Sequence, residues 1–196
     1  MTTYRYFATA ARGLEPLVAE ELKQLGAEAV EPGFAGVGFE GDRALLYRVN
    51  LWGRLPFRVL LQLAEQGSRD AKQLYRGVQT IDWSQYLTPD QTFAVRATGK
   101  NRQLNHTHFT ALQVKNAIVD QQRRQCGERS SIDTDAPDLQ VNVHIGSDRA
   151  TISLDSTGES LHRRGYRPAM GDAPLKETLA AALLKLADWT PEQPFL

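Results

Sequence analysis

The order of the apolar segments at the start of the chain constrains its fold more than any other feature. The first segment, Tyr4–Thr9, is rich in aromatic residues and predicts a strand. The second, Leu14–Leu25, carries leucine and valine at helical spacing, and Gly26 follows where a helix commonly ends. The chain therefore opens with a strand and a helix.

Three more strands and a second helix follow within the first 66 residues. Ala27–Glu31 and Val37–Glu40 are short strand candidates on either side of a Pro32-Gly33 turn. Asp42 stands at the N-cap position of the next helix, and Phe57–Ala64 is the fourth strand. This strand-helix-strand-strand-helix-strand order predicts a ferredoxin-like βαββαβ domain.

A second α/β domain is predicted after the polar break at Gly67–Asp70. Its expected elements are a helix over Ala71–Gln79, a strand over Phe93–Ala97, a helix over Thr107–Gln125, and strands over Leu139–Ile145 and Ala150–Leu154. The last two strands alternate apolar and polar residues around a short polar turn, which predicts an antiparallel hairpin. The chain as a whole is therefore expected to be α+β.

The final residues predict a helix that needs a partner. Asp172-Ala173-Pro174 is a helix start, because proline is tolerated in the first helical turn. Leucine and alanine from Leu175 through Ala187 form an apolar stripe on this helix. We expect the stripe to pack on a further domain, so that the sequence is the front part of a longer protein.

The charges of the chain are unevenly distributed. The 196 residues have a net charge of zero, but residues 96–129 carry seven Lys and Arg against two Asp and Glu. Polyanion binding depends on a local basic surface and not on the total charge. The neutral total therefore does not exclude a nucleic-acid partner.

The sequence predicts a cytoplasmic protein without a membrane partner. The longest apolar run, Leu179–Leu184, has six residues, whereas a bilayer crossing needs about 20. The first residues contain no apolar stretch of the signal-peptide type. Cys126 is the single cysteine, so it has no partner for an internal disulfide.

Two other motifs are better explained without a ligand. Gly36–Gly41 matches G-x-G-x-x-G, but Asp42 follows at once and would repel a phosphate, so turn and strand-edge glycines are the favoured interpretation. His106, His108 and Cys126 lack a fourth metal ligand at a sensible spacing. We therefore expect no metal site and no dinucleotide site.

A polar, basic loop over residues 99–108 is more informative. It runs from a predicted strand into the long helix and carries Lys100 and Arg102, with Thr107 or Asn105 as the expected helix cap. Cations and backbone amides at a helix start suit a phosphate. The pattern alone is equally consistent with a solvated connector.

Lys115 lies inside the apolar arc of the long helix, on the same side as His108. A lysine at such a position either extends its amine past the edge of the core or points at an anion, and the pattern slightly favours the first. Arg123 and Arg124 end the helix, where cations also interact favourably with the helix dipole.

The region after the second domain carries a family resemblance. Gly158–Arg167 reads Gly-Glu-Ser-Leu-His-Arg-Arg-Gly-Tyr-Arg, and Ala173–Ala181 reads Ala-Pro-Leu-Lys-Glu-Thr-Leu-Ala-Ala. This run resembles the junction between the THUMP domain and the catalytic domain of bacterial guanine-N2 methyltransferases of large-subunit rRNA. Ala11–Glu15 and Gln113–Asp120 fit the same family. The resemblance covers essentially the whole chain, and 158–183 is its specific part.

The resemblance implies three parts. They are a ferredoxin-like domain at 1–66, a THUMP RNA-binding domain at 67–157, and a linker with the first helix of a Rossmann-type methyltransferase domain at 158–196. In the family, an Asp-Pro-x-Cys-Gly-Ser-Gly loop holds S-adenosylmethionine, and an Asn/Asp-Pro-Pro-Tyr loop positions the target amine. Neither motif occurs here. We therefore expect no cofactor or catalytic residue in this chain, and S-adenosylmethionine in the full-length parent.

The resemblance also implies structured RNA as the partner, most of all 23S rRNA. THUMP modules are similar in recognising folded RNA by shape and backbone, which suits contacts from lysine and arginine. The expected RNA-binding residues are Lys100, Arg102, Asn105, His106, Thr107, His108, Lys115, Arg163, Arg164 and Arg167. The three arginines after position 160 have two open roles: they line the RNA path, or they hold the linker by pairing with acidic neighbours.

Two alternative functions fit the same residues. One is the RNA-binding part of a tRNA methyltransferase or of a THUMP-containing thiolation enzyme, and the 158–183 junction argues against thiolation. The other is a structural domain that orients a catalytic partner and touches no RNA. Charge reversal at Lys100, Arg102 and Lys115 separates them, because it leaves RNA affinity unchanged only if the domain is structural.

Overall fold

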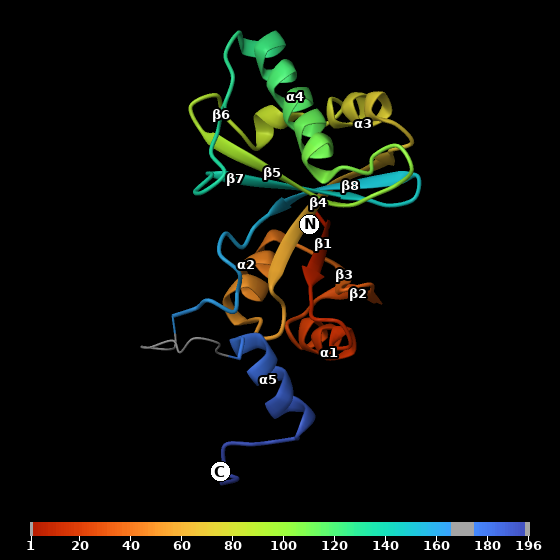
Figure 1. The fold of residues 1–196 in the computed structure, drawn as a ribbon. Coiled ribbons are helices and arrows are strands. Elements are labelled where there is room, and N and C mark those ends of the chain that lie inside the picture. Colours follow the sequence, from red (N-terminus) through yellow and green to blue (C-terminus); the bar gives the residue numbers. More distant parts are fainter. Residues whose placement is uncertain (1, 166–174, 195–196) are drawn as a thin grey trace. The chain divides into compact units, whose positions relative to one another are not determined.

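The structure, a computed structural model, describes residues 2–165 and 175–194 (Figure 1). Its internal contacts divide the chain into two units. Unit 1 comprises Met1–Leu60 and Ser156–Leu196, and unit 2 comprises Leu61–Asp155. Strand β4 (Arg58–Gly67) crosses the division and contributes residues to both units.

Unit 1 has the βαββαβ order that the sequence predicts. Its elements are β1 (Tyr4–Thr9), α1 (Glu15–Gln24), β2 (Glu28–Gly33), β3 (Gly36–Gly41), α2 (Arg43–Trp52) and the start of β4. The strands lie in the order β2-β3-β1-β4, and β3 pairs antiparallel with β1 and with β2. The ferredoxin-like arrangement is confirmed.

Local signals in the sequence set the ends of the unit 1 helices. The Asp42 carboxylate accepts a hydrogen bond from the Leu45 amide at 2.7 Å, so the predicted N-cap of α2 is confirmed. Gly26 follows Leu25, the C-cap of α1, and has a φ of +93°, a conformation that favours glycine. The core of unit 1 packs these helices on the strands through Tyr6, Ala8, Val18, Leu22, Val37, Phe39, Leu45, Val49 and Val59.

The turn predicted at Pro32-Gly33 is wrong. Both residues belong to β2, and the turn consists of Phe34 and Ala35, with Gly33 paired to Gly36. Strand β2 lies at the edge of the sheet, where the missing amide of a proline costs no ladder hydrogen bond. The proline therefore does not end the strand as it would in a central position.

Unit 2 places two helices on one face of a sheet (Figure 1). Its elements after β4 are α3 (Ala71–Val78), a 3-10 turn η1 (Trp83–Gln85), β5 (Thr92–Gly99), α4 (Thr107–Cys126), β6 (Ser131–Ile132), β7 (Leu139–Ile145) and β8 (Arg149–Asp155). The strands lie in the order β4-β8-β7-β5-β6. Strand β7 is parallel to β5 and antiparallel to β8, so the predicted hairpin is confirmed.

Helix α4 supplies much of the core of unit 2. Val114, Ala117 and Ile118 are fully buried and belong to one apolar cluster with Val141 and Val143 of β7. Burying a valine or isoleucine side chain stabilises a fold by roughly 1.5–3 kcal/mol. The packing therefore fixes which face of α4 is turned toward the sheet.

A buried glutamine near the end of α4 holds the segment between α3 and β5. The Gln121 side-chain oxygen accepts the Trp83 amide at 3.0 Å, and its nitrogen donates to the carbonyls of Ile81 at 2.8 Å and Gln79 at 3.0 Å. Because Gln121 is only 6% exposed, water does not replace these partners readily.

Replacing Gln121→Met keeps the approximate volume and leaves three backbone groups without their partner. We expect the free energy of unfolding to fall by about 2–4 kcal/mol, measured by urea denaturation. Gln125→Met, at an exposed position on the same helix, is the control and should change it by less than about 0.5 kcal/mol. Equal effects of the two substitutions would contradict the role of Gln121.

Helix α5 (Glu177–Leu186) buries little of its surface. Thr178 and Ala182 are buried, whereas the apolar residues Leu183 and Leu186 are more than half exposed. Lys185 forms an ion pair with Glu20 of α1 at 3.2 Å. The helix start predicted at 172–174 lies outside the described residues.

We predict that backbone amides of α5 exchange with solvent at least about tenfold faster than those of α4, because few buried contacts hold α5 in place. Native-state hydrogen exchange with mass spectrometry measures both helices in one sample. Equal protection of the two helices would show that α5 is held as firmly as the core.

Candidate nucleic-acid interface

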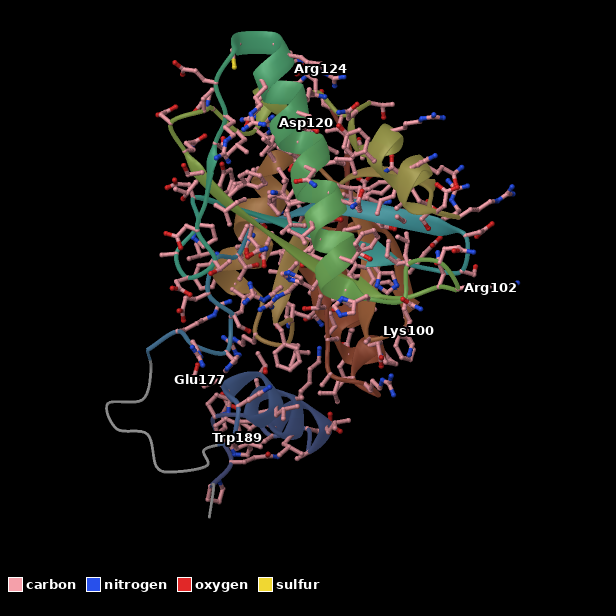
Figure 2. The ribbon with its side chains drawn as sticks, turned by 45° about the horizontal axis from the view of Figure 1, so that its top comes forward. Lys100, Arg102, Asp120, Arg124, Glu177 and Trp189 are labelled. Carbon is pink, nitrogen blue, oxygen red and sulfur yellow. The ribbon has the colours of Figure 1, made fainter. Side chains whose placement is uncertain are left out.

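The loop between β5 and α4 presents two of the expected RNA-binding residues. Lys100 and Arg102 are exposed, and Figure 2 shows them at one end of α4, away from Asp120 and Arg124. Their side chains form no ion pair or hydrogen bond with any residue that the structure describes. Both charges are therefore available to an external anion.

Asn101 gives this loop a defined conformation. Its side-chain nitrogen donates to the Ser68 carbonyl at 2.8 Å, and its oxygen accepts the amides of Gln103 at 3.0 Å and Leu104 at 2.8 Å. Leu104 is 1% exposed and anchors the loop in the core. These hydrogen bonds hold the loop in one conformation. Asn101 was not among the functional residues predicted from the sequence.

Gly99 places a further requirement on the start of the loop. Its φ of +70° favours glycine, and a side chain at this position would collide with the Ile145 carbonyl. Close contact between the end of β5 and the end of β7 therefore sets the direction in which the chain enters the loop.

The cap of α4 differs from the prediction. His106, and not Thr107 or Asn105, is the N-cap residue, and its ring Nδ1 accepts the Phe109 amide at 3.4 Å. Thr107 is the first helical residue, and both Thr107 and Asn105 are exposed. A neutral histidine ring has an acceptor nitrogen, so it can replace the usual serine, threonine or aspartate cap.

Two other expected residues extend along α4. His108 is exposed, with its ring centroid 6.4 Å from that of His106. Lys115 is half-buried and lies seven residues, or about two helical turns, further along. Lys100, Arg102, His106 and His108 therefore gather at the start of α4, and Lys115 is set back from them.

The expected arginines after position 160 belong to unit 1. Arg164 donates to the carbonyls of Leu51 and Gly53, both at 2.5 Å, and to that of Asn50 at 3.1 Å, so it caps the end of α2. Arg163 is exposed and pairs with Glu159 at 3.8 Å. Arg167 lies outside the described residues.

The G-x-G-x-x-G segment does not provide a cradle for a nucleotide. It forms β3, and side chains added at Gly36 and Gly41 would collide with Phe7 and Leu45. Close packing therefore explains these two glycines. The residues present do not fit the phosphate or S-adenosylmethionine loop of a Rossmann domain.

Several titratable side chains of the described residues form hydrogen bonds that stabilise turns, strand ends or helix packing. Hydrogen bonds from turn or strand groups lower the pKa values of Asp82, Asp133 and Asp138. The Tyr75 hydroxyl donates a hydrogen bond to the Asp120 carboxylate at 2.7 Å, and this bond together with burial raises the pKa of Tyr75.

Among residues 2–165 and 175–194, no group of three or more His, Cys, Asp or Glu could hold a metal ion.

A second basic cluster lies at the start of α3. Arg69 precedes the N-cap Asp70, and Lys72 and Arg76 stand at i and i+4 on one face of the helix. The RNA-binding residues predicted from the sequence do not include these three. The three residues line a depression of about 510 Å³ in unit 2.

Family models match most of the chain. The model of the RlmL ferredoxin-like domain matches residues 5–60, and that of the THUMP domain matches residues 68–155. The RMKL-like methyltransferase domain model matches residues 164–196. The chain therefore contains the ferredoxin-like and THUMP domains of this methyltransferase group.

Proteins with similar sequences are named as RNA methyltransferases. "Putative RNA methyltransferase slr0064" of Synechocystis sp. is 62% identical over 98% of the chain, which covers 50% of that protein. Ribosomal RNA large subunit methyltransferase K/L of Syntrophotalea carbinolica is 48% identical over 94% of the chain, which covers 26% of that protein. The chain thus spans half or less of the length of these relatives, and the family resemblance stated above is confirmed.

A solved structure has a similar fold. The crystal structure of "SMU.472, a putative methyltransferase complexed with SAH" superposes with a TM-score of 0.86 and 30% identity. It covers all of this chain, which in turn covers 52% of that protein.

Within the described residues, no helix has both the length and the apolar character that a membrane crossing requires.

The neighbouring arginines of unit 1 give a matched test of structural roles. Arg164→Met removes the donors to the carbonyls of Asn50, Leu51 and Gly53 at the end of α2, and we expect a loss of about 2 kcal/mol in the free energy of unfolding. Arg163→Met removes the same charge from an exposed pair and should cost less than about 0.5 kcal/mol. Urea denaturation of both variants measures the difference, and similar losses would show that Arg164 does not hold the end of α2.

Proposed function

We propose that this chain is the RNA-recognition region of an S-adenosylmethionine-dependent methyltransferase that modifies guanine N2 in 23S rRNA. The proposal divides the chain into a ferredoxin-like domain at 1–66, a THUMP domain at 67–157 and a linker with a helix at 158–196. Methyl transfer and cofactor binding belong to the catalytic domain of the parent protein. A cytoplasmic location fits the free, exposed Cys126.

The ordered basic loop at the start of α4 is the observation that carries the proposal. Lys100 and Arg102 are exposed beside the first turn of a 20-residue helix, and neither side chain has a partner among the residues that the structure describes. Helix amides and nearby cations together suit the phosphates of a nucleic-acid backbone. This loop lies within the segment that matches the THUMP model.

Shape and backbone recognition fits the side chains available at this surface. Besides the two cations, His106 and His108 offer exposed rings, and Asn105 and Thr107 offer exposed polar groups. Proteins bind folded RNA largely through phosphate and 2′-hydroxyl contacts, with aromatic stacking on unpaired bases. Arg163 and Arg167 stay candidates for the RNA path, and Arg164 for the linker.

The relatives support the methyl donor and the class of substrate. The names of the relatives refer to RNA and to large-subunit ribosomal RNA, and the similar solved structure holds SAH. SAH is S-adenosylmethionine after loss of its methyl group. The choice of guanine N2 rests on the resemblance of the 158–183 junction.

Fluorescence anisotropy with a labelled hairpin of large-subunit rRNA tests the proposal. We expect Lys100→Gln/Arg102→Gln to weaken binding at least about tenfold at 0.1 M salt and to reduce the slope of log K against log salt by about 1.5. The control, Arg123→Gln/Arg124→Gln, removes the same charge from the other end of α4. Absence of binding by the folded wild-type chain at 50 mM salt would contradict the proposal.

A tRNA competitor decides between the proposed function and its alternatives. Stronger competition by tRNA than by the unlabelled rRNA hairpin would assign the chain to a tRNA-modifying enzyme. Binding to neither RNA would assign it a structural role in orienting a catalytic domain.

A further inference from the structure

The depression on α3 is a second basic feature, separate from the β5–α4 loop. Arg69, Lys72 and Arg76 line it, with the side chains of Gln66 and Gln73 between them. All of these residues belong to unit 2. None of them is among the RNA-binding residues predicted from the sequence.

The three cations are unpaired in the described structure. Each side chain is exposed and forms no ion pair or hydrogen bond there. Asp70 also lines the depression, but its carboxylate accepts the Gln73 amide at 2.7 Å as the cap of α3. The rim therefore has a net charge of +2.

This arrangement is unfavourable for the helix by itself. Lys72 and Arg76 stand at i and i+4, where like charges repel, and Lys72 lies in the first turn, where a cation opposes the helix dipole. An anion in the depression would relieve both effects. The helix therefore gains from a bound anion at this position.

The walls of the depression have a defined shape. Added side chains at Gly67 and Gly77 would collide with the amides of Gln73 and Gln66, respectively. The Gln73 oxygen accepts the Arg69 amide at 2.9 Å. The buried Gln66 oxygen has no hydrogen-bond partner among the described residues. The side chains of Gln66 and Gln73 therefore line the depression with amides.

The depression adjoins the basic loop. Asn101, between Lys100 and Arg102, donates to the carbonyl of Ser68, the residue next to Arg69. This side-chain-to-backbone hydrogen bond holds the basic loop next to the segment that carries Arg69. A single polyanion can contact both.

We propose that the depression on α3 binds a phosphodiester segment of the same RNA that contacts the Lys100–Arg102 loop. The inference rests on the proposed RNA-binding function and extends it to Arg69, Lys72 and Arg76. Their charges contact at least two phosphates. The side-chain amides that line the depression offer hydrogen bonds to the RNA backbone. The RNA therefore follows a basic track from α3 to the start of α4.

The test uses the whole chain and the labelled rRNA hairpin. Arg69→Gln/Lys72→Gln/Arg76→Gln is compared with Arg123→Gln/Arg124→Gln/Arg129→Gln, which removes three exposed charges from the far end of α4 and the residues after it. We expect at least about tenfold weaker binding at 0.1 M salt and a slope smaller by about 2 for the first variant only. Equal losses in both variants, or no loss in the first, would overturn the inference.

Lys72→Glu separates binding from stability. Glutamate at this position pairs with Arg76 and suits the first helical turn, so the thermal midpoint should stay the same or rise. RNA binding should nevertheless weaken at least about fivefold. A variant that binds RNA as tightly as the wild type would contradict the inference even if the Lys100 and Arg102 variants are impaired. If the wild type itself does not bind, the proposed function fails first.

Discussion

The packing of α4 on the sheet of unit 2 is the interaction on which the candidate interface depends. Val114, Ala117 and Ile118 fix the rotation of the helix, and the buried Gln121 holds the segment that leads from α3 to β5. With this face buried, the start of α4 and its basic loop are directed to solvent. The packing of the apolar core therefore determines where the exposed Lys100 and Arg102 lie.

Polar contacts then give the surface its detail. Asn101 joins the basic loop to the residues before α3, and the side chains of Gln66 and Gln73 line the depression beside α3. In unit 1, Arg164 uses its donors on the end of α2, although the sequence presents it beside Arg163 as another cation. Two neighbouring arginines therefore differ in their contacts: Arg164 donates to backbone carbonyls, whereas Arg163 is exposed and forms a surface ion pair with Glu159.

Sequence periodicity predicted most of the fold, because buried faces repeat at fixed intervals in helices and strands. It failed at Pro32, whose effect depends on the edge position of β2, and at the α4 cap, where His106 replaces the usual residue types. The basic loop was predicted from composition and spacing. The cluster on α3 was missed because Arg69, Lys72 and Arg76 gain significance only when the depression beside them is seen.

Lysine footprinting tests most directly whether RNA binds along this track. The chain is acetylated with and without the rRNA hairpin, and modification is read by mass spectrometry. The account predicts that RNA protects Lys72 and Lys100, while the exposed Lys23 of α1 reacts equally in both samples. Protection of Lys23 with unchanged reaction at Lys72 and Lys100 would place the RNA elsewhere and contradict the account.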